Sequence, residues 1–324
     1  MYVEECGKSM HEYRLYYAGF DKTTGVEQIG LAISDDLIRW RRPLPGPIVS
    51  LASTGYADAV QTSNPCVLKR PEGYRMWYQG RNTEGQISIC HAVSDDGISW
   101  VFGDAPVLAV APEARGNRVG YHHPHVLFDT DRATYCLWCT RYENDSSHFL
   151  YAESADGIRW SVKAEKALAP EKEWEGKQIF YPCVLADGDS LTAWYSGIRS
   201  KKEWQIGRAL SRDGIEWIRE PDRAVLPERL QSKPERFIHE QLARLGIYTR
   251  RGLSAFGTAS PNVWKEGGRY HMLAHDVGPQ SKLSIGHYVS QDGIIWQQIG
   301  WDILAEGRGG WDSFFQGDPF LLIV

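Results

Sequence analysis

Five residues stand directly before a proline at the start of a short apolar segment: Asn64, His123, Tyr181, Ser260 and Asp318. They differ from one another although the sequences around them agree. Such divergence inside a repeat is typical of one asymmetric binding site. Asp318 could act as a general base, and the imidazole of His123 could transfer protons at neutral pH. The set predicts acid–base chemistry on a polar ligand, although polar residues also precede proline in turns that have no function.

Three arginines end equivalent segments of the chain. Arg81, Arg141 and Arg199 follow WYQG, WCT and WYSGI. Guanidinium groups aimed at one mouth would repel one another unless an anionic ligand held them through bidentate hydrogen bonds, so they predict a phosphate or carboxylate on the ligand. The alternative is that they pair with the nearby carboxylates Glu84, Glu143 and Glu203. The other substrate-binding candidates are Asn64, His122, Ser260, His275 and Asp276.

A further set of polar residues lies seven positions before the prolines. Its members are Asp58, Asn117, Glu175, Ser254 and Asp312. Their recurrence favours a backbone-capping role in the connecting loops, above all for Asp312. Asp58 and Glu175 are also candidate catalytic acids, because these loops would overhang the mouth where the other candidates meet.

The scaffold that must position these residues is a fivefold repeat. The repeated segments are SDDLIRW (34–40), SDDGISW (94–100), SADGIRW (154–160), SRDGIEW (211–217) and SQDGIIW (290–296). Each Ser-x-Asp-Gly is a tight polar turn in which Gly can adopt a positive φ and Asp can bond the neighbouring backbone. Alternating apolar segments on either side give four short strands per unit, the number found in a propeller blade.

The N-terminal unit lacks an opening strand, because residues 13–20 already match the second strand of the other units. The segment 317–324 supplies it, so we expect the C-terminal strand to complete the N-terminal blade and close the ring. The sequence therefore predicts an all-β chain, a five-bladed β-propeller formed as a single domain by residues 1–324. One short helix is expected at 232–246, before the fifth blade, either as a cover or as a lid carrying His239 or Glu240.

Composition narrows the classes of partner. The net charge of −5 gives no reason to expect nucleic acid, and no apolar run is long enough to cross a membrane. The first residues have no signal-peptide core, so a cytoplasmic location is expected. Cys136 and Cys139 form a CxxC pair, but on a strand they would point to opposite faces, which favours a structural role over zinc binding.

The turns, the x-P-x-V strand openings and the WDSFFQGDPF segment (311–320) together resemble the five-bladed propeller glycosidases of glycoside hydrolase families 43 and 32. The resemblance covers almost the whole chain and implies that Asp318 is the catalytic base. It places the family's orienting Asp where this chain has His123, and the general-acid Glu where it has Phe180 and Tyr181. One carboxylate of the three is therefore retained.

Glycoside hydrolysis usually needs two carboxyl groups. The candidate partners for Asp318 are Glu175, Asp58, Asp276, Glu240, His122 and His123, with Tyr181 as an alternative nucleophile. The first hypothesis is a carbohydrate-active enzyme, most simply a glycosidase, acting on a small sugar that carries a phosphate, carboxylate or nucleotide. The second is a non-catalytic propeller that binds a sugar or a protein. No cofactor is expected, and a metal ion on the axis, near His122, His123, His125 and His275, is the less favoured alternative.

Overall fold

The computed structural model describes residues 11–21, 23–51, 57–111, 113–114, 119–199, 203–226, 256–277, 283–304, 310–312 and 315–324. The helix expected at 232–246, with His239 and Glu240, lies outside these ranges, as do Asn117 and Ser254. Within them the structure is almost entirely β, with a single 3₁₀ turn at Glu173–Glu175. The all-β prediction is therefore confirmed.

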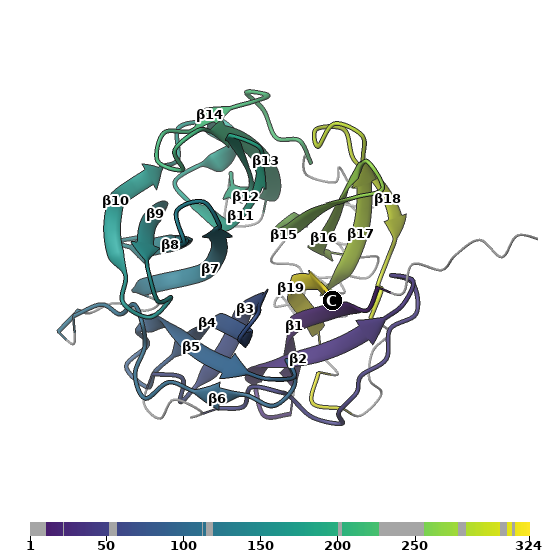
Figure 1. Cartoon of the computed structure of the whole chain (residues 1–324). Coiled ribbons are helices and arrows are strands. Elements are labelled where there is room, and N and C mark those ends of the chain that lie inside the picture. Colours follow the sequence, from purple (N-terminus) through teal and green to yellow (C-terminus); the bar gives the residue numbers. More distant parts are fainter. Residues whose placement is uncertain are drawn as a thin grey trace, which may run out of the picture.

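The strands form three sheets, and their antiparallel pairings divide them into five groups arranged around a common centre (Figure 1). The first group consists of β19 (Phe315–Ile323), β1 (Tyr13–Asp21) and β2 (Val26–Ser34). The second consists of β3 (Gln61–Arg70), β4 (Gly73–Arg81), β5 (Ile87–Ser94) and β6 (Val101–Phe102), and the third of β7 (Gly120–Asp129), β8 (Thr134–Glu143), β9 (Ser146–Ser154) and β10 (Ser161–Leu168). The fourth consists of β11 (Ile179–Asp187), β12 (Ser190–Ile198), β13 (Glu203–Ser211) and β14 (Ile218–Arg219), and the fifth of β15 (Phe256–Glu266), β16 (Arg269–Val277), β17 (Leu283–Ser290) and β18 (Gln297–Gly300).

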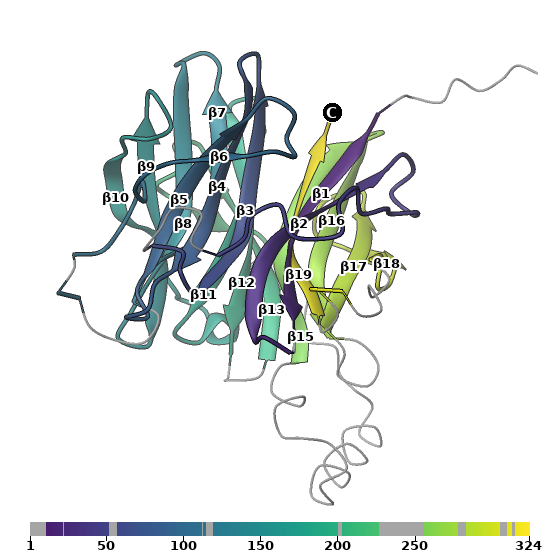
Figure 2. The same ribbon diagram turned by 90° about the horizontal axis from the view of Figure 1, so that it is seen from below.

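The C-terminal strand pairs with the N-terminal one. β19 runs antiparallel to β1 from the pair Tyr13–Ile323 to the pair Phe20–Phe315, and the two lie side by side in the edge view (Figure 2). On its other edge β1 pairs with β2. The C-terminal segment therefore occupies the place of the opening strand in the first group.

The repeated turns link neighbouring groups. In each turn the Asp carboxylate accepts hydrogen bonds from the backbone, as Asp96 does from the amides of Ile98 and Ser99, which lowers its pKa to about 2. The carbonyl of the turn glycine accepts a bond from a ring of the preceding group. The indole of Trp77, for example, donates to Gly157 at 2.8 Å. Three further links repeat this contact: Tyr16 to Gly97, Trp138 to Gly214 and Trp194 to Gly293.

The link between the fifth and first groups is apolar instead. Leu273 stands where the other units have an aromatic ring, and Leu37, with φ of 62°, replaces the turn glycine. Both leucines lie in one buried cluster with Trp264 and Leu321. The contact between the fifth and first groups therefore relies on burial of apolar surface, whereas the other four contacts also have a hydrogen bond.

The cysteines are core residues. All five that the structure describes are buried. Cys136 packs in one cluster with Trp138, whereas Cys139 packs with Trp77 in another, so they face opposite sides of β8 as predicted. Among the described residues, no helix is long and apolar enough to cross a membrane.

Candidate functional site

The five residues before the prolines share one unusual backbone conformation. Their φ angles lie between 47° and 57°, in the left-handed region that side chains other than Gly rarely adopt. In every group the strand pairing shifts register at this point, which marks a β-bulge. A following proline disfavours the right-handed helical region but by itself favours an extended backbone, so the positive φ belongs to the bulge. The members of the set are Asn64 (51°), His123 (50°), Tyr181 (57°), Ser260 (53°) and Asp318 (47°).

The bulges surround a central cavity of about 290 Å³. Four of the five bulge residues line it, and Ser260 instead borders a smaller void of about 30 Å³ that also contacts Asp318. The cavity is therefore lined by residues from all five groups of strands. Its lining residues are Glu27, Gln61, Asn64, Gln79, Ile87, His122, His123, Tyr142, Gln178, Phe180, Tyr181, Ile198, Trp204, His275, Phe315 and Asp318.

Asp318 is the buried carboxyl group of this cavity. Only 8% of the residue is exposed. Loss of hydration raises its pKa to about 7, and a hydrogen bond with the Ser260 side chain opposes that rise. Near neutral pH the group can therefore either accept or donate a proton, which is what acid–base catalysis requires.

Aromatic rings form a second wall. The rings of His123 and Tyr181 lie 3.9 Å apart between centroids, and Trp204 lies 6.0 Å from Tyr181. The Nδ1 of His123 lies 3.2 Å from the hydroxyl of Thr140, which fixes the imidazole. Flat rings beside polar groups are typical of a pocket for a small polar ring compound.

His275 and Phe315 stack with their rings nearly parallel at 5.8 Å. Burial lowers the pKa of His275 to about 4, so its imidazole is neutral at pH 7. Its Nε2 is buried without a hydrogen-bond partner. The side chain of Asp276, the next candidate in the sequence, lies outside the described part of the chain.

Glu27 is a second carboxyl group on the cavity wall, and it was missed by the sequence analysis. Gln61 donates from Nε2 to its Oε2. Glu27 lies opposite Phe20 in the pairing of β1 with β2. Arg81, Arg141 and Arg199 lie at or near the ends of the strands equivalent to β1, so the first residues of the strand that follows β1 could have been considered by the same argument.

The amides of Gln61, Asn64 and Gln79 meet at one hydroxyl. Their side-chain nitrogens lie 3.3, 3.0 and 3.2 Å from Ser63 Oγ. Gln79 is buried. These contacts hold the wall formed by the second group of strands in one arrangement.

The three arginines do not meet in the cavity. Arg141 pairs with Glu143 at 2.8 Å, and Arg199 lies 3.3 Å from Glu173 and 3.9 Å from Glu203. Arg81 is not among the described lining residues. Arg141 and Arg199 thus have local carboxylate partners, because Glu143 and Glu203 lie within a few residues of them on the same hairpins.

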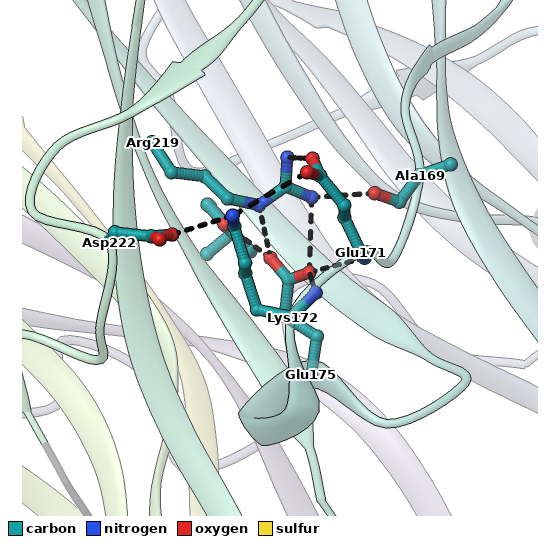
Figure 3. A network of polar contacts seen from close by, with 7 residues as sticks. Ala169, Glu171, Lys172, Glu175, Arg219 and Asp222 are labelled. Atoms are coloured by element: carbon teal, nitrogen blue, oxygen red, sulfur yellow. Dashed lines mark hydrogen bonds and ion pairs between the residues drawn. The ribbon is translucent and has the colours of Figure 1, made fainter.

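Glu175 is fully buried in a polar network instead of facing the cavity (Figure 3). It accepts hydrogen bonds from the phenol of Tyr195 at 2.6 Å and from Arg219 Nε at 2.8 Å. Its Oε2 also accepts bonds from the backbone amides of Glu171 and Lys172, so it caps the connecting loop. Every oxygen is thus bound within the protein, and the role of catalytic acid is corrected to a structural one.

Asp58 is likewise fully buried and accepts a bond from the phenol of Tyr78 at 3.0 Å. It is not among the residues lining the cavity. Asp312 binds Tyr17 at 2.7 Å and Arg42 at 2.7 Å. The backbone-capping set therefore binds tyrosines of the second strands, and Asp58 is also corrected to a structural residue.

His125 bonds the carbonyl of Val184 at 2.8 Å through Nε2, and burial lowers its pKa to about 4. Among the described side chains, no group of three or more His, Cys, Asp or Glu could hold a metal ion.

Comparison with solved structures identifies proteins of the same fold. A thermostable family-43 glycoside hydrolase matches with a TM-score of 0.64 at 17% identity, covering 94% of this chain and 93% of that one. An exo-1,5-α-L-arabinanase from a bovine ruminal metagenomic library matches with a TM-score of 0.61 at 11% identity, covering 92% and 95%. A family-32 β-fructofuranosidase of Bombyx mori matches at 0.60 and 12% identity, covering 90% of this chain and 60% of that one. The chain therefore has the fold of the propeller glycosidases, which confirms the resemblance drawn from its turns and strand openings.

Sequence comparison is less informative. No family model matches the chain. It is 30% identical over 197 residues to a protein of Mycobacterium tuberculosis (strain CDC 1551 / Oshkosh) named "Uncharacterized protein MT1551". The match covers 56% of this chain and 62% of that relative, so it spans less than two thirds of the relative's length.

Proposed function

We propose that this protein is a carbohydrate-active enzyme, most simply a glycoside hydrolase that works in the central cavity. The observation that carries the proposal is Asp318, a buried carboxyl group on the cavity wall whose pKa is raised to about 7. A carboxyl group tuned to neutral pH in an aromatic pocket is suited to proton transfer. The solved structures of this fold that are described as glycoside hydrolases support the same class of reaction.

The proposal includes a closed ring of five blades. Each of the five antiparallel groups is one blade, and the pairing of β19 with β1 supports closure of the ring within the first blade. The five bulges, one from each blade, then face the axis. This arrangement explains why one cavity is lined by residues as distant in sequence as Glu27 and Asp318.

The ligand in this proposal is a small uncharged sugar. The cavity of about 290 Å³ lies at the lower end of the range for ligand pockets. Among the described lining residues there are two carboxyl groups and four amides but no Lys or Arg. These residues would hydrogen-bond hydroxyl groups and would repel a phosphate or carboxylate, so we infer a neutral sugar in place of the anionic one that the arginines predicted.

Asp318 is the proposed base. Its carboxylate would take a proton from a water molecule as that water attacks the anomeric carbon, with Tyr181 and Trp204 packing against the sugar ring. A single displacement by water inverts the configuration of the anomeric carbon. The burial that raises the pKa of Asp318 makes its carboxylate a stronger base than an exposed aspartate.

Turnover on a panel of aryl α- and β-glycosides tests this function. The panel should contain neutral pentosides and hexosides together with the matching uronosides, and NMR of the first product would give its configuration. Hydrolysis of a neutral glycoside with inversion is expected. A folded protein that converts no member of the panel would contradict the proposal.

A second function, a non-catalytic sugar-binding propeller, has one observation in its favour. Phe180 and Tyr181 stand where the resemblance places the general-acid Glu, and both rings line the cavity. A binder would keep its affinity for the parent sugars without converting the glycosides. Calorimetry with the free sugars, run beside the turnover assay, separates the two functions.

A further inference from the structure

We infer that Glu27 is the second catalytic carboxyl group of this site and acts as the general acid opposite Asp318. The inference rests on the proposed hydrolase function and deepens it. The usual position of the acid, at the opening of the blade that contains Tyr181, has no carboxylate in this chain. Glu27 comes from a different blade and a different strand, β2.

Two carboxyl groups reach the cavity. Among the residues whose side chains the structure describes, Glu27 and Asp318 are the two carboxyl groups that line it. Glu175 is fully buried elsewhere, with both oxygens bound by Tyr195, Arg219 and backbone amides. Asp58 is fully buried against Tyr78. Glycoside hydrolysis usually requires two carboxyl groups at one site, and these are the two that the described lining supplies.

Neighbouring residues hold Glu27 in place. In the pairing of β1 with β2 it lies opposite Phe20, and the Phe20 ring stacks on Phe315 at 5.4 Å. Phe315 in turn stacks on His275, and both line the cavity. The amide of Gln61 donates to Glu27 Oε2. One hydrogen bond and an aromatic neighbour therefore orient the carboxyl group, as a catalytic acid requires.

The proposed reaction transfers one proton from Glu27 and one proton to Asp318. The protonated Glu27 gives its proton to the glycosidic oxygen as the bond from that oxygen to the anomeric carbon breaks, and the bonding electron pair stays on the oxygen. Water forms the new bond to the anomeric carbon and gives one proton to the Asp318 carboxylate. The products are two hydroxyl compounds, and the two carboxyl groups have exchanged their protonation states. Exchange with solvent restores them.

The test uses the leaving group. For the neutral glycoside that the wild type hydrolyses, the phenyl and 2,4-dinitrophenyl forms are compared in wild type, Glu27→Gln and Glu203→Gln. Glu203 is the matched control, because it is also a partly buried glutamate, lies beside the lining residue Trp204 and pairs with Arg199. Loss of a general acid typically costs ~10²- to 10⁴-fold where the leaving group needs protonation. The phenyl glycoside should lose that much in Glu27→Gln, and the dinitrophenyl glycoside less than about tenfold, because its anion leaves without a proton.

A pH profile provides a second readout that a purely structural residue would not change. The alkaline fall in kcat/KM should disappear in Glu27→Gln, since that fall reports loss of the acid's proton. Glu27→Asp keeps a carboxyl group that can donate a proton. Its activity should therefore change by a similar factor on the phenyl and the dinitrophenyl glycoside. Thermal melting confirms that each variant is folded.

The outcomes are distinct. Equal losses on both leaving groups, no loss on either, or the same pattern in Glu203→Gln would each overturn the assignment of Glu27 while leaving the hydrolase function intact. A wild type that binds or converts none of the glycosides would overturn the proposed function itself, and with it the role of Glu27.

Discussion

The Glu175 carboxylate lies 2.6 Å from the phenol oxygen of Tyr195. The same pairing recurs as Asp312 with Tyr17 and Asp58 with Tyr78. In the two remaining units the tyrosine is replaced by Cys139 or Ala274, and the acid by Asn117 or Ser254. A unit of this chain thus has both the acid and the tyrosine or has neither. This joint occurrence indicates that the carboxylates belong to the scaffold.

Breaking this contact should lower the stability of the protein without changing its affinity for the ligand. Glu175→Gln leaves the charge of Arg219, whose side chain is 6% exposed, without its buried counter-ion. Removing one member of a buried ion pair costs about 3 kcal/mol of unfolding free energy, or somewhat more. Urea unfolding measures the loss. Glu171→Gln, which touches the same arginine from an exposed position, is the control and should cost under about 1 kcal/mol.

Asp318→Asn should abolish turnover while keeping the fold. The amide is nearly isosteric with the carboxyl group but cannot accept a proton from water, so kcat should fall by at least ~100-fold. The assay uses the best aryl glycoside, with a thermal melt of the same sample. Unchanged turnover in a folded Asp318→Asn would remove this residue from the mechanism.

The same variant should change how stability depends on pH. The folded-state pKa of Asp318 is about 7, whereas in the unfolded chain the group ionises near its usual value of 3.8. Between these pH values the folded state binds the proton more tightly than the unfolded chain does. The unfolding free energy of the wild type, relative to that of Asp318→Asn, therefore falls as pH rises from about 4 to 7. Above about pH 7 this difference is constant. Urea unfolding of both proteins at acidic and alkaline pH gives this difference. A difference in unfolding free energy that stays constant across this pH range would show that the pKa of Asp318 is not raised in the folded protein.

Arg141→Gln should leave sugar affinity unchanged. Arg141 pairs with Glu143 and is not among the described residues lining the cavity, whereas His123 is. Calorimetry with neutral and carboxylated sugars should therefore give less than about a twofold change for Arg141→Gln, because this guanidinium is paired with Glu143 and does not line the cavity. His123→Ala is the comparison and should weaken binding of the neutral sugar. Selective loss of the carboxylated sugar in Arg141→Gln would restore the anionic-ligand hypothesis.

The turn links between blades predict a difference between two tryptophans. Trp77 donates its indole N–H to the carbonyl of Gly157, whereas the indole nitrogen of Trp160 has no partner. Trp77→Phe leaves a buried carbonyl without its donor and should cost about 1–3 kcal/mol beyond the loss of ring area. Trp160→Phe removes only area and should cost less. Denaturant unfolding of both variants compares the two losses.

Much of the scaffold could be predicted because it depends on local chemistry repeated in register. The five Ser-x-Asp-Gly turns and five pre-proline positions each need particular residues at fixed offsets, and these offsets are visible in the sequence. The structure adds a shared positive φ at the pre-proline residues, from Asn64 to Asp318. That conformation explains why each of these side chains departs from the alternation of its strand and turns toward the centre.

Sequence alone predicted that the chain is all-β, that its C-terminal strand pairs with β1, and that Asn64, His123, Tyr181 and Asp318 lie together. The structure lines one cavity with these four residues, because equivalent positions in a repeat occupy equivalent places in the fold. Only the tertiary structure decided which charged groups reach that site. Arg141 and Glu175 sit at repeat positions that pointed to the mouth, yet nearby partners satisfy them. Glu27 carries no sequence motif and reaches the cavity because strand pairing places it there. A charge is satisfied by whichever partner lies nearest in space, and that distance is set by the fold.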